Sequence, residues 1–366
     1  MGRPDRGRTG RISRTEEHES MQAVILAGGK GTRLRPLTIH TPKPIVPVVN
    51  RPFLLYQIDL LSRPQIKNLI LCLSYQPRKI EELLSDGSRF GIRISYLVEA
   101  SPLGTAGAFK NAEEMIEGTT VVFNGDILTD VDLSRVIDQH RSSGAVATIV
   151  VTPVDDPIGY GVVEMADDGR VTRFVEKPRR EEVHSRMVNA GIYVLEPTVL
   201  EHIPEGRPFS FEYDFFPSLW EKGEAFYAYR HDGYWVDIGT PEGYLKGNLD
   251  VLNGRLKSYI PQRPPRGEKF DSQAHLDDRS FVDPSCIIKA QARIVNSVIG
   301  PNCFIEEKAE IRDSVIWSAT RIGAEARVSR CVIGRGCHVG RSSVLDGAVL
   351  GDKSVVTDYS RVRAEV

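Results

Sequence analysis

Cysteine is scarce in this 366-residue chain, and its spacing excludes two common roles. The five cysteines include no C-x-x-C pair, and the N-terminal residues contain no apolar secretory segment. We therefore expect neither a disulfide framework nor a zinc site, and a reducing, cytoplasmic location. Residues 1–20 are polar, and we expect them to form a disordered N-terminal extension.

Long apolar runs and a strong net charge are also missing. The longest apolar runs are as short as a strand, for example residues 146–151, whereas a membrane span needs roughly 20 residues. The net charge is only −2, which gives no bias toward nucleic acid or an anionic membrane. We expect neither as a partner, so any phosphate binding must be local.

The length predicts two domains, and the pattern of residues changes between them. In residues 21–253, short β-branched runs alternate with helical patterns, which predicts an α/β domain with a Rossmann-like, doubly wound, mixed or parallel sheet. Such sheets bind ligands at the carboxyl ends of their strands, where residues 28–33 and 124–126 should emerge. Residues 254–273 are rich in Pro, Gly and charge and are predicted to be a linker.

Residues 274–360 follow a hexapeptide pattern. Large aliphatic residues recur every five or six positions, and a small residue stands two positions before almost every one. This pattern predicts a parallel β-helix with three short strands per coil of 17 residues. Cys286 and Cys303 should then stack on adjacent coils, as small apolar packers rather than as a disulfide. His338 is predicted to face solvent, which disfavours an acyltransferase reading of the β-helix.

The stretch "LAGGKGTRLRPLTIHTPKP", residues 26–44, is the most informative segment, and we call it the signature loop. It fits neither the Walker pattern nor the dinucleotide fingerprint. Its glycines would let backbone N–H groups approach a polyphosphate, and Arg33 and Lys43 supply positive charge. Three prolines stiffen it, so that its donors are preorganised. The alternative is a basic surface loop.

Further motifs occur in a fixed order after the signature loop: "PLGTAGA" (102–108), "NGD" (124–126), "YGVV" (160–163), "FVEKP" (174–178), "NAGIY" (189–193), "EYDFFP" (212–217) and "WVDIGTPEGYL" (235–245). With these motifs the chain resembles the sugar-1-phosphate nucleotidyltransferases, also called nucleotide-sugar pyrophosphorylases. A C-terminal left-handed parallel β-helix also occurs in that family. The resemblance covers nearly the whole chain.

The resemblance implies that a sugar 1-phosphate oxygen attacks the α-phosphorus of a nucleoside triphosphate and releases pyrophosphate. Arg33 would steady the leaving pyrophosphate, Lys43 would lie at the α-phosphate, and Asp126 and Asp237 would be catalytic residues that hold Mg²⁺. The nucleotide site implied in this way comprises Leu26, Ala27, Gly28, Gly29, Gly31, Thr32, Glu99, Gly104, Thr105, Asn124 and Gly125. The implied sugar-phosphate site comprises Gly161, Glu176, Lys177, Asn189, Gly191 and Asp214, with Tyr213 at its border.

Glu99 bears on the choice of base. An ionised carboxylate only accepts hydrogen bonds, and guanine presents two adjacent donors, whereas uracil and thymine present a donor between acceptors that an amide suits better. Pyrimidine-using members of the family often carry Gln here. We therefore expect GTP, and mannose 1-phosphate as the sugar partner, because the chain is most similar to mannose-1-phosphate guanylyltransferases.

Three alternatives stay open at this point. One is a glucose-1-phosphate uridylyl- or thymidylyltransferase, and a second is a heptose-1-phosphate guanylyltransferase. The third is a catalytically silent regulatory paralogue, which would have lost the charged residues that this chain retains. The flat faces and ends of the β-helix also favour a homo-oligomer.

Overall fold

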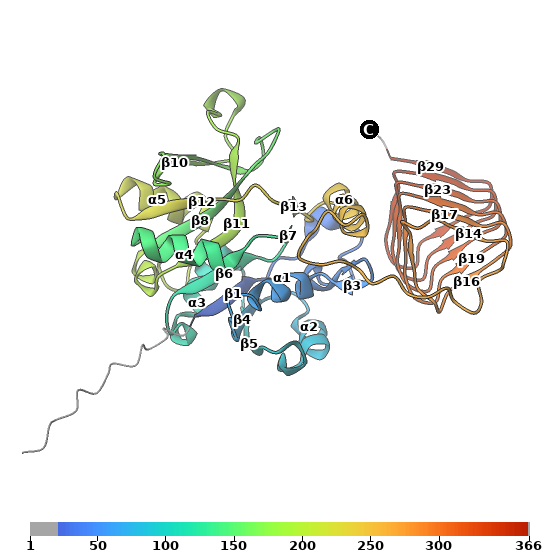
Figure 1. Cartoon of the computed structure of the whole chain (residues 1–366), viewed down its shortest axis with the longest axis horizontal. Coiled ribbons are helices and arrows are strands. Elements are labelled where there is room, and N and C mark those ends of the chain that lie inside the picture. Colours follow the sequence, from blue (N-terminus) through green and yellow to red (C-terminus); the bar gives the residue numbers. More distant parts are fainter. Residues whose placement is uncertain (1–20, 365–366) are drawn as a thin grey trace, which may run out of the picture.

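The computed structural model describes residues 21–364, and Figure 1 shows a helix-flanked sheet beside a stack of short strands. The extension expected at residues 1–20 lies outside the described residues. Within the described part of the chain, no helix has both the length and the apolar character needed to cross a membrane. The two regions are built in different ways and are taken in turn.

The first region is built on a nine-stranded mixed sheet. Its main path runs β10-β9-β11-β6-β1-β4-β5, and β8 joins β11 and β12. The strands are β1 (Gln22–Leu26), β4 (Asn68–Leu73), β5 (Arg93–Val98), β6 (Thr120–Asn124), β8 (Ala147–Pro153), β9 (Gly161–Met165), β10 (Val171–Glu176), β11 (Met187–Leu195) and β12 (Phe226–Arg230). β1 pairs in parallel with β4 and β6, whereas β11 pairs antiparallel with β6.

Helices cover both faces of this sheet, which explains the continuous apolar strands. In β1, Ala23 and Ile25 pack in one core while Val24 packs in the other, and all three are fully buried. The helices are α1 (Leu54–Leu61), α2 (Pro77–Leu84), α3 (Gly104–Asn111), α4 (Leu133–Ser143), α5 (Phe216–Glu221) and α6 (Pro241–Leu252). The predicted doubly wound mixed sheet is confirmed.

A small sheet stands apart from the main one and positions two functional segments. β7 (Ile127–Thr129) follows β6 directly, and β13 (Trp235–Asp237) precedes α6. The two strands pair antiparallel with Asp237 opposite Ile127. α6 begins where the Thr240 hydroxyl accepts the N–H of Gly243, with Pro241 in the first turn.

The second region is a three-sided parallel β-helix, as the repeat predicts. One side contains β14 (His275–Leu276), β17 (Arg293–Val295), β20 (Glu310–Arg312), β23 (Arg327–Ser329), β26 (Val344–Asp346) and β29 (Arg361–Arg363). The second contains β15 (Phe281–Val282), β18 (Val298–Ile299), β21 (Val315–Ile316), β24 (Val332–Ile333) and β27 (Val349–Leu350). The third contains β16 (Ile287–Ile288), β19 (Phe304–Ile305), β22 (Arg321–Ile322), β25 (His338–Val339) and β28 (Val355–Val356).

The interior of the β-helix consists of stacked aliphatic and small side chains. Ile299 pairs with Ile316 and Ile316 with Ile333, and all three are fully buried. All five cysteines of the chain are free and buried, and Cys286 and Cys303 lie in this interior. The stretch between Leu252 and His275, which the structure describes throughout, contains no helix and no strand, and only Phe270 pairs, in an isolated parallel bridge to Ile288.

The two regions share an apolar interface. Its contributors from the first region include Leu34 and Leu37 of the signature loop and Tyr244 of α6, and its contributors from the β-helix include Val315 and Trp317. Asn50, between β2 (Pro47–Val48) and β3 (Arg51–Pro52), donates to the carbonyl of Ile299 at 2.9 Å. The signature loop is therefore packed against the β-helix as well as against the sheet.

Candidate active site

Two carboxylates meet where β7 and β13 pair. Asp126 immediately precedes β7, and Asp237 ends β13 on the opposite strand. The N–H of Ile238 donates to the carbonyl of Asp126 at 3.0 Å, which fixes the two backbones beside each other. This pairing brings together two acids that lie far apart in the sequence.

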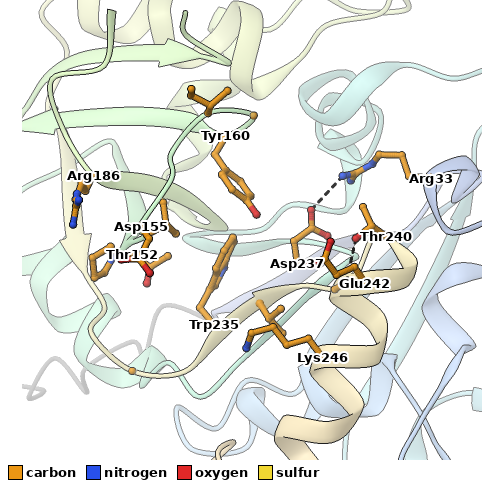
Figure 2. A pocket seen from close by; sticks show the side chains of 17 residues that line it. Arg33, Thr152, Asp155, Tyr160, Arg186, Trp235, Asp237, Thr240, Glu242 and Lys246 are labelled. Carbon is orange, nitrogen blue, oxygen red and sulfur yellow. Dashed lines mark hydrogen bonds and ion pairs between the residues drawn. The ribbon is translucent and has the colours of Figure 1, made fainter. Parts of the chain in front are cut away.

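The two cations of the signature loop lie against this pair of acids. Lys43 donates from Nζ to Asp126 Oδ2 at 2.6 Å. The guanidinium of Arg33 lies 3.5 Å from Asp126 and 3.4 Å from Asp237, the second contact being drawn in Figure 2. The Lys43 side chain is 11% exposed and that of Arg33 is 60% exposed, so Lys43 is held in place while Arg33 can turn toward a ligand.

The electrostatics of the acids depend on these cations. Burial raises the pKa of Asp237, and the charge on Asp126 raises it further. Burial acts on Asp126 in the same direction, but Lys43 and Arg33 outweigh it and hold the pKa of Asp126 below its ordinary value. The cluster therefore keeps at least one carboxylate ionised near neutral pH.

The donor set suits Mg²⁺ only in the presence of a phosphate ligand. Asp126 and Asp237 supply hard oxygen atoms, and Mg²⁺ is commonly held by one or two carboxylates together with substrate phosphates and water. Within residues 21–364, no group of three or more His, Cys, Asp or Glu side chains could hold a metal ion. The two acids thus fit a cation that is shared with a nucleotide.

A cavity of about 200 Å³ adjoins the cluster and contains much of the predicted nucleotide site. Its lining includes Leu26, Ala27, Gly29, Lys43, Thr105, Asn124, Gly125 and Asp126. Gly28, Gly31, Thr32 and Gly104 flank these residues in the chain but do not line the cavity. Asn124 lines this cavity, and its Oδ1 atom is buried without a hydrogen-bond partner.

Two glycines of this region are required by close packing or by backbone conformation. A Cβ atom at Gly125 would lie 2.6 Å from the carbonyl oxygen of Leu26, so only glycine lets β6 and β1 approach here. Gly31 has a φ of +61°, and its carbonyl accepts the Thr38 hydroxyl at 2.7 Å. These contacts hold the glycine-rich part of the signature loop in one conformation.

A second cavity, of about 360 Å³, contains most of the predicted sugar-phosphate site. Gly161, Glu176, Lys177, Asn189, Gly191 and Tyr213 line it, together with Arg33, Asp126 and Asp237. Asp214 does not line it, because its carboxylate accepts the N–H of Ser210 at 2.8 Å. The structure therefore places five of the six predicted sugar-phosphate residues around one cavity that includes three of the four catalytic candidates.

Glu176, which lines this cavity, has a raised pKa. Burial, and next the nearby Glu212, raise its pKa to about 7. Lys177 lies 3.7 Å away and partly opposes this shift. Lys177 has a φ of +48°, so the backbone turns at this residue and both side chains of the pair reach the same cavity.

Glu212 lines the same cavity but was not among the predicted site residues. Its carboxylate accepts the hydroxyls of Thr105 at 2.8 Å and Ser210 at 2.7 Å, and it lies 3.4 Å from the Asn124 amide. It thus links helix α3 to the strand that leads to Asp126. The motif at residues 212–217 contains two acids, and the sequence does not reveal which of them turns inward.

Glu99, the predicted base-reading residue, lies just after β5 and outside the 200 Å³ cavity. Its side chain is half-buried, and burial raises its pKa. The N–H of Leu103 lies 3.4 Å from its Oε2 atom, and its own N–H donates to the carbonyl of Leu73 at 2.8 Å. Glu99 therefore lies at the carboxyl end of β5, beside Leu103, the residue that precedes α3.

Two aromatic residues separate the 360 Å³ cavity from a wider one of about 800 Å³. Tyr160 and Trp235 line both, and their rings lie 5.6 Å apart in an edge-to-face arrangement. Figure 2 shows Tyr160 directed toward Arg33 and Asp237. The indole N–H of Trp235 donates to the carbonyl of Ala190 at 3.0 Å, which fixes the ring. Neither residue was predicted to line the site, although Tyr160 begins the motif "YGVV" and Trp235 begins the motif "WVDIGTPEGYL".

The fold and the charged cluster at the carboxyl ends of its strands define an α/β nucleotide-binding domain that carries a parallel β-helix. The chain belongs to the sugar-1-phosphate nucleotidyltransferase family. The family model described as nucleotidyl transferase matches residues 22–254, and one described as the EIF2B subunit epsilon LbH domain matches residues 266–362. The second match agrees with the left-handed β-helix that the sequence predicts, and the predicted family and fold are both confirmed.

Several relatives are similar over most of their length. A mannose-1-phosphate guanylyltransferase of Mycobacterium tuberculosis is 38% identical over 73% of this chain and 73% of its own. A mannose-1-phosphate guanyltransferase of Saccharomyces cerevisiae is 36% identical over 72% of each. A UTP–glucose-1-phosphate uridylyltransferase of Synechocystis is 35% identical over 76% of this chain and 82% of its own.

Two solved structures resemble the first region. HddC from Yersinia pseudotuberculosis is 34% identical with a TM-score of 0.54, and covers 62% of this chain and 97% of its own. A putative glucose-1-phosphate thymidylyltransferase from Bacillus anthracis is 26% identical with a TM-score of 0.57, and covers 62% of this chain and 94% of its own. The relatives thus include different bases and sugars within one family.

Proposed function

We propose that this protein transfers the guanylyl group of GTP to mannose 1-phosphate in a Mg²⁺-dependent reaction that yields GDP-mannose and pyrophosphate. The observation that carries the proposal is the cluster of Arg33, Lys43, Asp126 and Asp237 between the two smaller cavities. One cavity suits a polyphosphate and the other a sugar phosphate, and the cluster borders both. Residues 21–253 would form the catalytic domain, 254–273 the linker and 274–360 the β-helix.

The proposed chemistry needs positioning and charge neutralisation rather than a protein nucleophile. A sugar 1-phosphate oxygen attacks the α-phosphorus in line, and pyrophosphate departs on the opposite side. Lys43, fixed by its contact with Asp126, would stand at the α-phosphate. Arg33, which is more exposed, would follow the charge that builds on the leaving pyrophosphate.

Mg²⁺, held by Asp126 and Asp237, would neutralise negative charge on the phosphate oxygens when bound. Lys177 would then pair with the phosphate of the sugar substrate, and Glu176 would accept hydrogen bonds from its hydroxyls. Both side chains line the 360 Å³ cavity, and Lys177 is the more exposed of the two. The positive charge of Lys177 suits the phosphate end of the substrate, and the carboxylate of Glu176 suits the hydroxyl groups at the other end.

Glu99 supports the choice of GTP. Because an ionised carboxylate accepts from both N1–H and the 2-amino group of guanine, it would favour this base by about 1 to 3 kcal/mol. The named guanylyltransferases among the relatives agree with this choice, while the uridylyltransferase of similar identity keeps UTP as the second candidate. A heptose 1-phosphate and a silent paralogue are the other readings that the experiment must exclude.

The test is a matrix of released pyrophosphate. The purified chain is incubated with Mg²⁺ and each of GTP, UTP, dTTP, ATP and CTP against mannose, glucose and heptose 1-phosphates. We expect the highest kcat/KM for GTP with mannose 1-phosphate, and no release after chelation until Mg²⁺ is restored. Equal rates with UTP would contradict the base assignment, a preference for another sugar would contradict the acceptor, and no release with any pair would indicate a silent paralogue.

A further inference from the structure

The signature loop is anchored by the β-helix as well as by its own domain. Leu34 and Leu37, which flank Pro36, are fully buried in the interface cluster. From the β-helix, Val298, Val315 and Val332 reach the same cluster, and each is at most 2% exposed. Because Leu34 directly follows Arg33, a change in this interface acts one residue away from the most exposed catalytic cation.

Trp317 is a β-helix residue that the repeat itself does not require. The equivalent positions in neighbouring coils are Gly300 and Gly334, so the coil can be built without a large side chain here. Its indole N–H donates at 2.9 Å to the hydroxyl of Tyr244, and the two rings pack edge to face. Within the β-helix the guanidinium of Arg335 lies 5.3 Å from the centre of the ring, but the hydrogen bond of the indole is made with the neighbouring domain.

Tyr244 connects Trp317 with the segments that carry the catalytic candidates. Its hydroxyl donates in turn to the carbonyl of Pro47, four residues after Lys43. Tyr244 also belongs to α6, whose first residue follows Asp237 by four positions. One buried phenol thus connects the β-helix with the chain segments that carry Lys43 and Asp237.

Gly351 makes the second contact. At Gly300 and Gly334 an added Cβ atom would meet the backbone nitrogen of the next coil at 2.8 Å. At Gly351, the last member of this stack, it would instead meet Cβ of Pro36 at 2.9 Å. Pro36 of the signature loop therefore packs against Gly351 in the way that the next coil packs against Gly300 and Gly334.

We propose that Trp317 and Gly351 are positioning residues for the transfer reaction: they hold the signature loop so that Arg33 and Lys43 face the phosphate. The inference rests on the function proposed above. Neither residue lines any of the three cavities beside the charged cluster. Any effect of Trp317 and Gly351 on the transfer reaction must therefore be transmitted through Pro36 and Tyr244.

The first test is Gly351→Ala, with Gly336→Ala as its matched control. An added methyl at Gly351 must push Pro36, whereas at Gly336 the nearest atom is Lys353 Cγ at 3.9 Å. Gly336 has a φ of +62°, which strains an alanine, but Ala319 adopts 58° at the equivalent position of the preceding coil, so the β-helix accommodates alanine in this conformation. We expect kcat to fall about tenfold in Gly351→Ala with the sugar-phosphate KM nearly unchanged, because small displacements of catalytic groups cost turnover. Equal kcat in Gly351→Ala and the control would overturn the role of Gly351.

The second test is a double-mutant cycle between Trp317→Phe and Tyr244→Phe. Each single change removes the hydrogen bond between the rings, so we expect about threefold lower kcat for Trp317→Phe and no further loss when it is added to Tyr244→Phe. Independent, additive losses, or an unchanged kcat in Trp317→Phe, would contradict the proposed path.

Amide hydrogen exchange separates this inference from the proposed function. The amides of Leu34, Leu37 and Val46 are hydrogen-bonded within the signature loop region, and we expect them to exchange several-fold faster in Gly351→Ala than in the control. Failure of the wild-type chain to release pyrophosphate would refute the function alone. Unchanged exchange in Gly351→Ala would refute the positioning role alone.

Discussion

The β-helix and the proposed catalytic domain, residues 21–253, are held together by different kinds of contact. In the β-helix each residue meets its equivalent one coil away, as where the N–H of Ser314 donates to Ser297 Oγ at 3.1 Å. In the catalytic domain the decisive contacts cross the whole fold, as between Arg33 and Asp237, 204 residues apart. The comparison shows that a periodic pattern is enough to build a scaffold, whereas the charged cluster depends on which strands the topology brings together.

The largest effect should come from removing a charge that acts across the fold. Arg33→Ala should lower kcat about 10²- to 10³-fold, because one preorganised donor to the developing charge is lost. The free energy of unfolding should change by less than about 0.5 kcal/mol, since the side chain is mostly exposed. Pyrophosphate release and urea unfolding measure the two quantities.

Arg35→Ala is the control for this prediction, because Arg35 is exposed two residues further along the same loop. Comparable losses of turnover in both variants would show that the loop contributes general positive charge rather than one placed guanidinium. In that case the exact placement of Arg33 by the fold would not matter, and the contrast drawn above between the two regions would not hold.

Ile322→Ala tests the other side of the comparison. Ile322 is fully buried between Ile305 and Val339 on the third side of the β-helix, away from the side that carries Val315. The cavity left behind should cost about 2 to 5 kcal/mol of unfolding free energy. The ratio of kcat/KM for GTP and UTP should stay unchanged.

Val355→Ala is the matched surface control for Ile322→Ala, since Val355 is 69% exposed on the same side and should cost less than about 0.5 kcal/mol. A changed nucleotide ratio in Ile322→Ala would show that the β-helix interior takes part in base selection, which the structure gives no reason to expect.

The β-helix could be predicted from the sequence almost residue by residue. The six-residue spacing gave the inward positions, and the structure buries Ile294, Ile311 and Val328 as the pattern requires. The mixed sheet could likewise be predicted from the alternation of β-branched runs and helical patterns. In both cases the signal is local, because each side chain's burial follows from a few residues on either side.

The site was less predictable where its geometry depends on how segments far apart in the sequence come together in the fold. Glu212 rather than Asp214 lines the 360 Å³ cavity, and the spacing of two acids in one helical turn does not decide between them. Tyr160, just before β9, and Trp235, at the start of β13, form a wall only because the fold brings their rings together. The contact of Trp317 with Tyr244 was also not predictable, because it joins a repeat to a fold with no repeat.

A smaller effect is expected at Glu99, which tests base selection within the catalytic domain. Glu99→Gln should lower the preference for GTP over UTP about 5- to 150-fold, the equivalent of about 1 to 3 kcal/mol, because an amide presents a donor to guanine N1–H. The ratio of kcat/KM values for the two nucleotides measures it. Unchanged selectivity would show that another group reads the base.

The smallest effect should be a pH dependence at Glu176. Its pKa, raised to about 7 by burial and by Glu212, lies above its ordinary value. Ionisation should improve hydroxyl binding, so the KM for the sugar phosphate should fall about threefold between about pH 6 and pH 8. Glu176→Gln should abolish this dependence, and a KM that changes equally in both proteins would assign the titration to another group.

Through Glu176, a rise in pH should improve sugar-phosphate binding but lower the stability of the fold. A folded-state pKa above the ordinary value stabilises the fold fully below that ordinary value, and the contribution is lost as pH rises through about 7. Glu176→Gln should therefore lose less stability than the wild-type chain between about pH 6 and pH 8. Thermal unfolding at the two pH values provides the comparison.

The most direct measurement is a crystal structure of the chain with Mg²⁺, GTP and mannose 1-phosphate under conditions that prevent turnover. We expect the α-phosphate beside Lys43, the cation on Asp126 and Asp237, and Arg33 turned from the acids toward the β- and γ-phosphates. A nucleotide bound elsewhere, or one bound here without contact to Arg33 or Lys43, would contradict it.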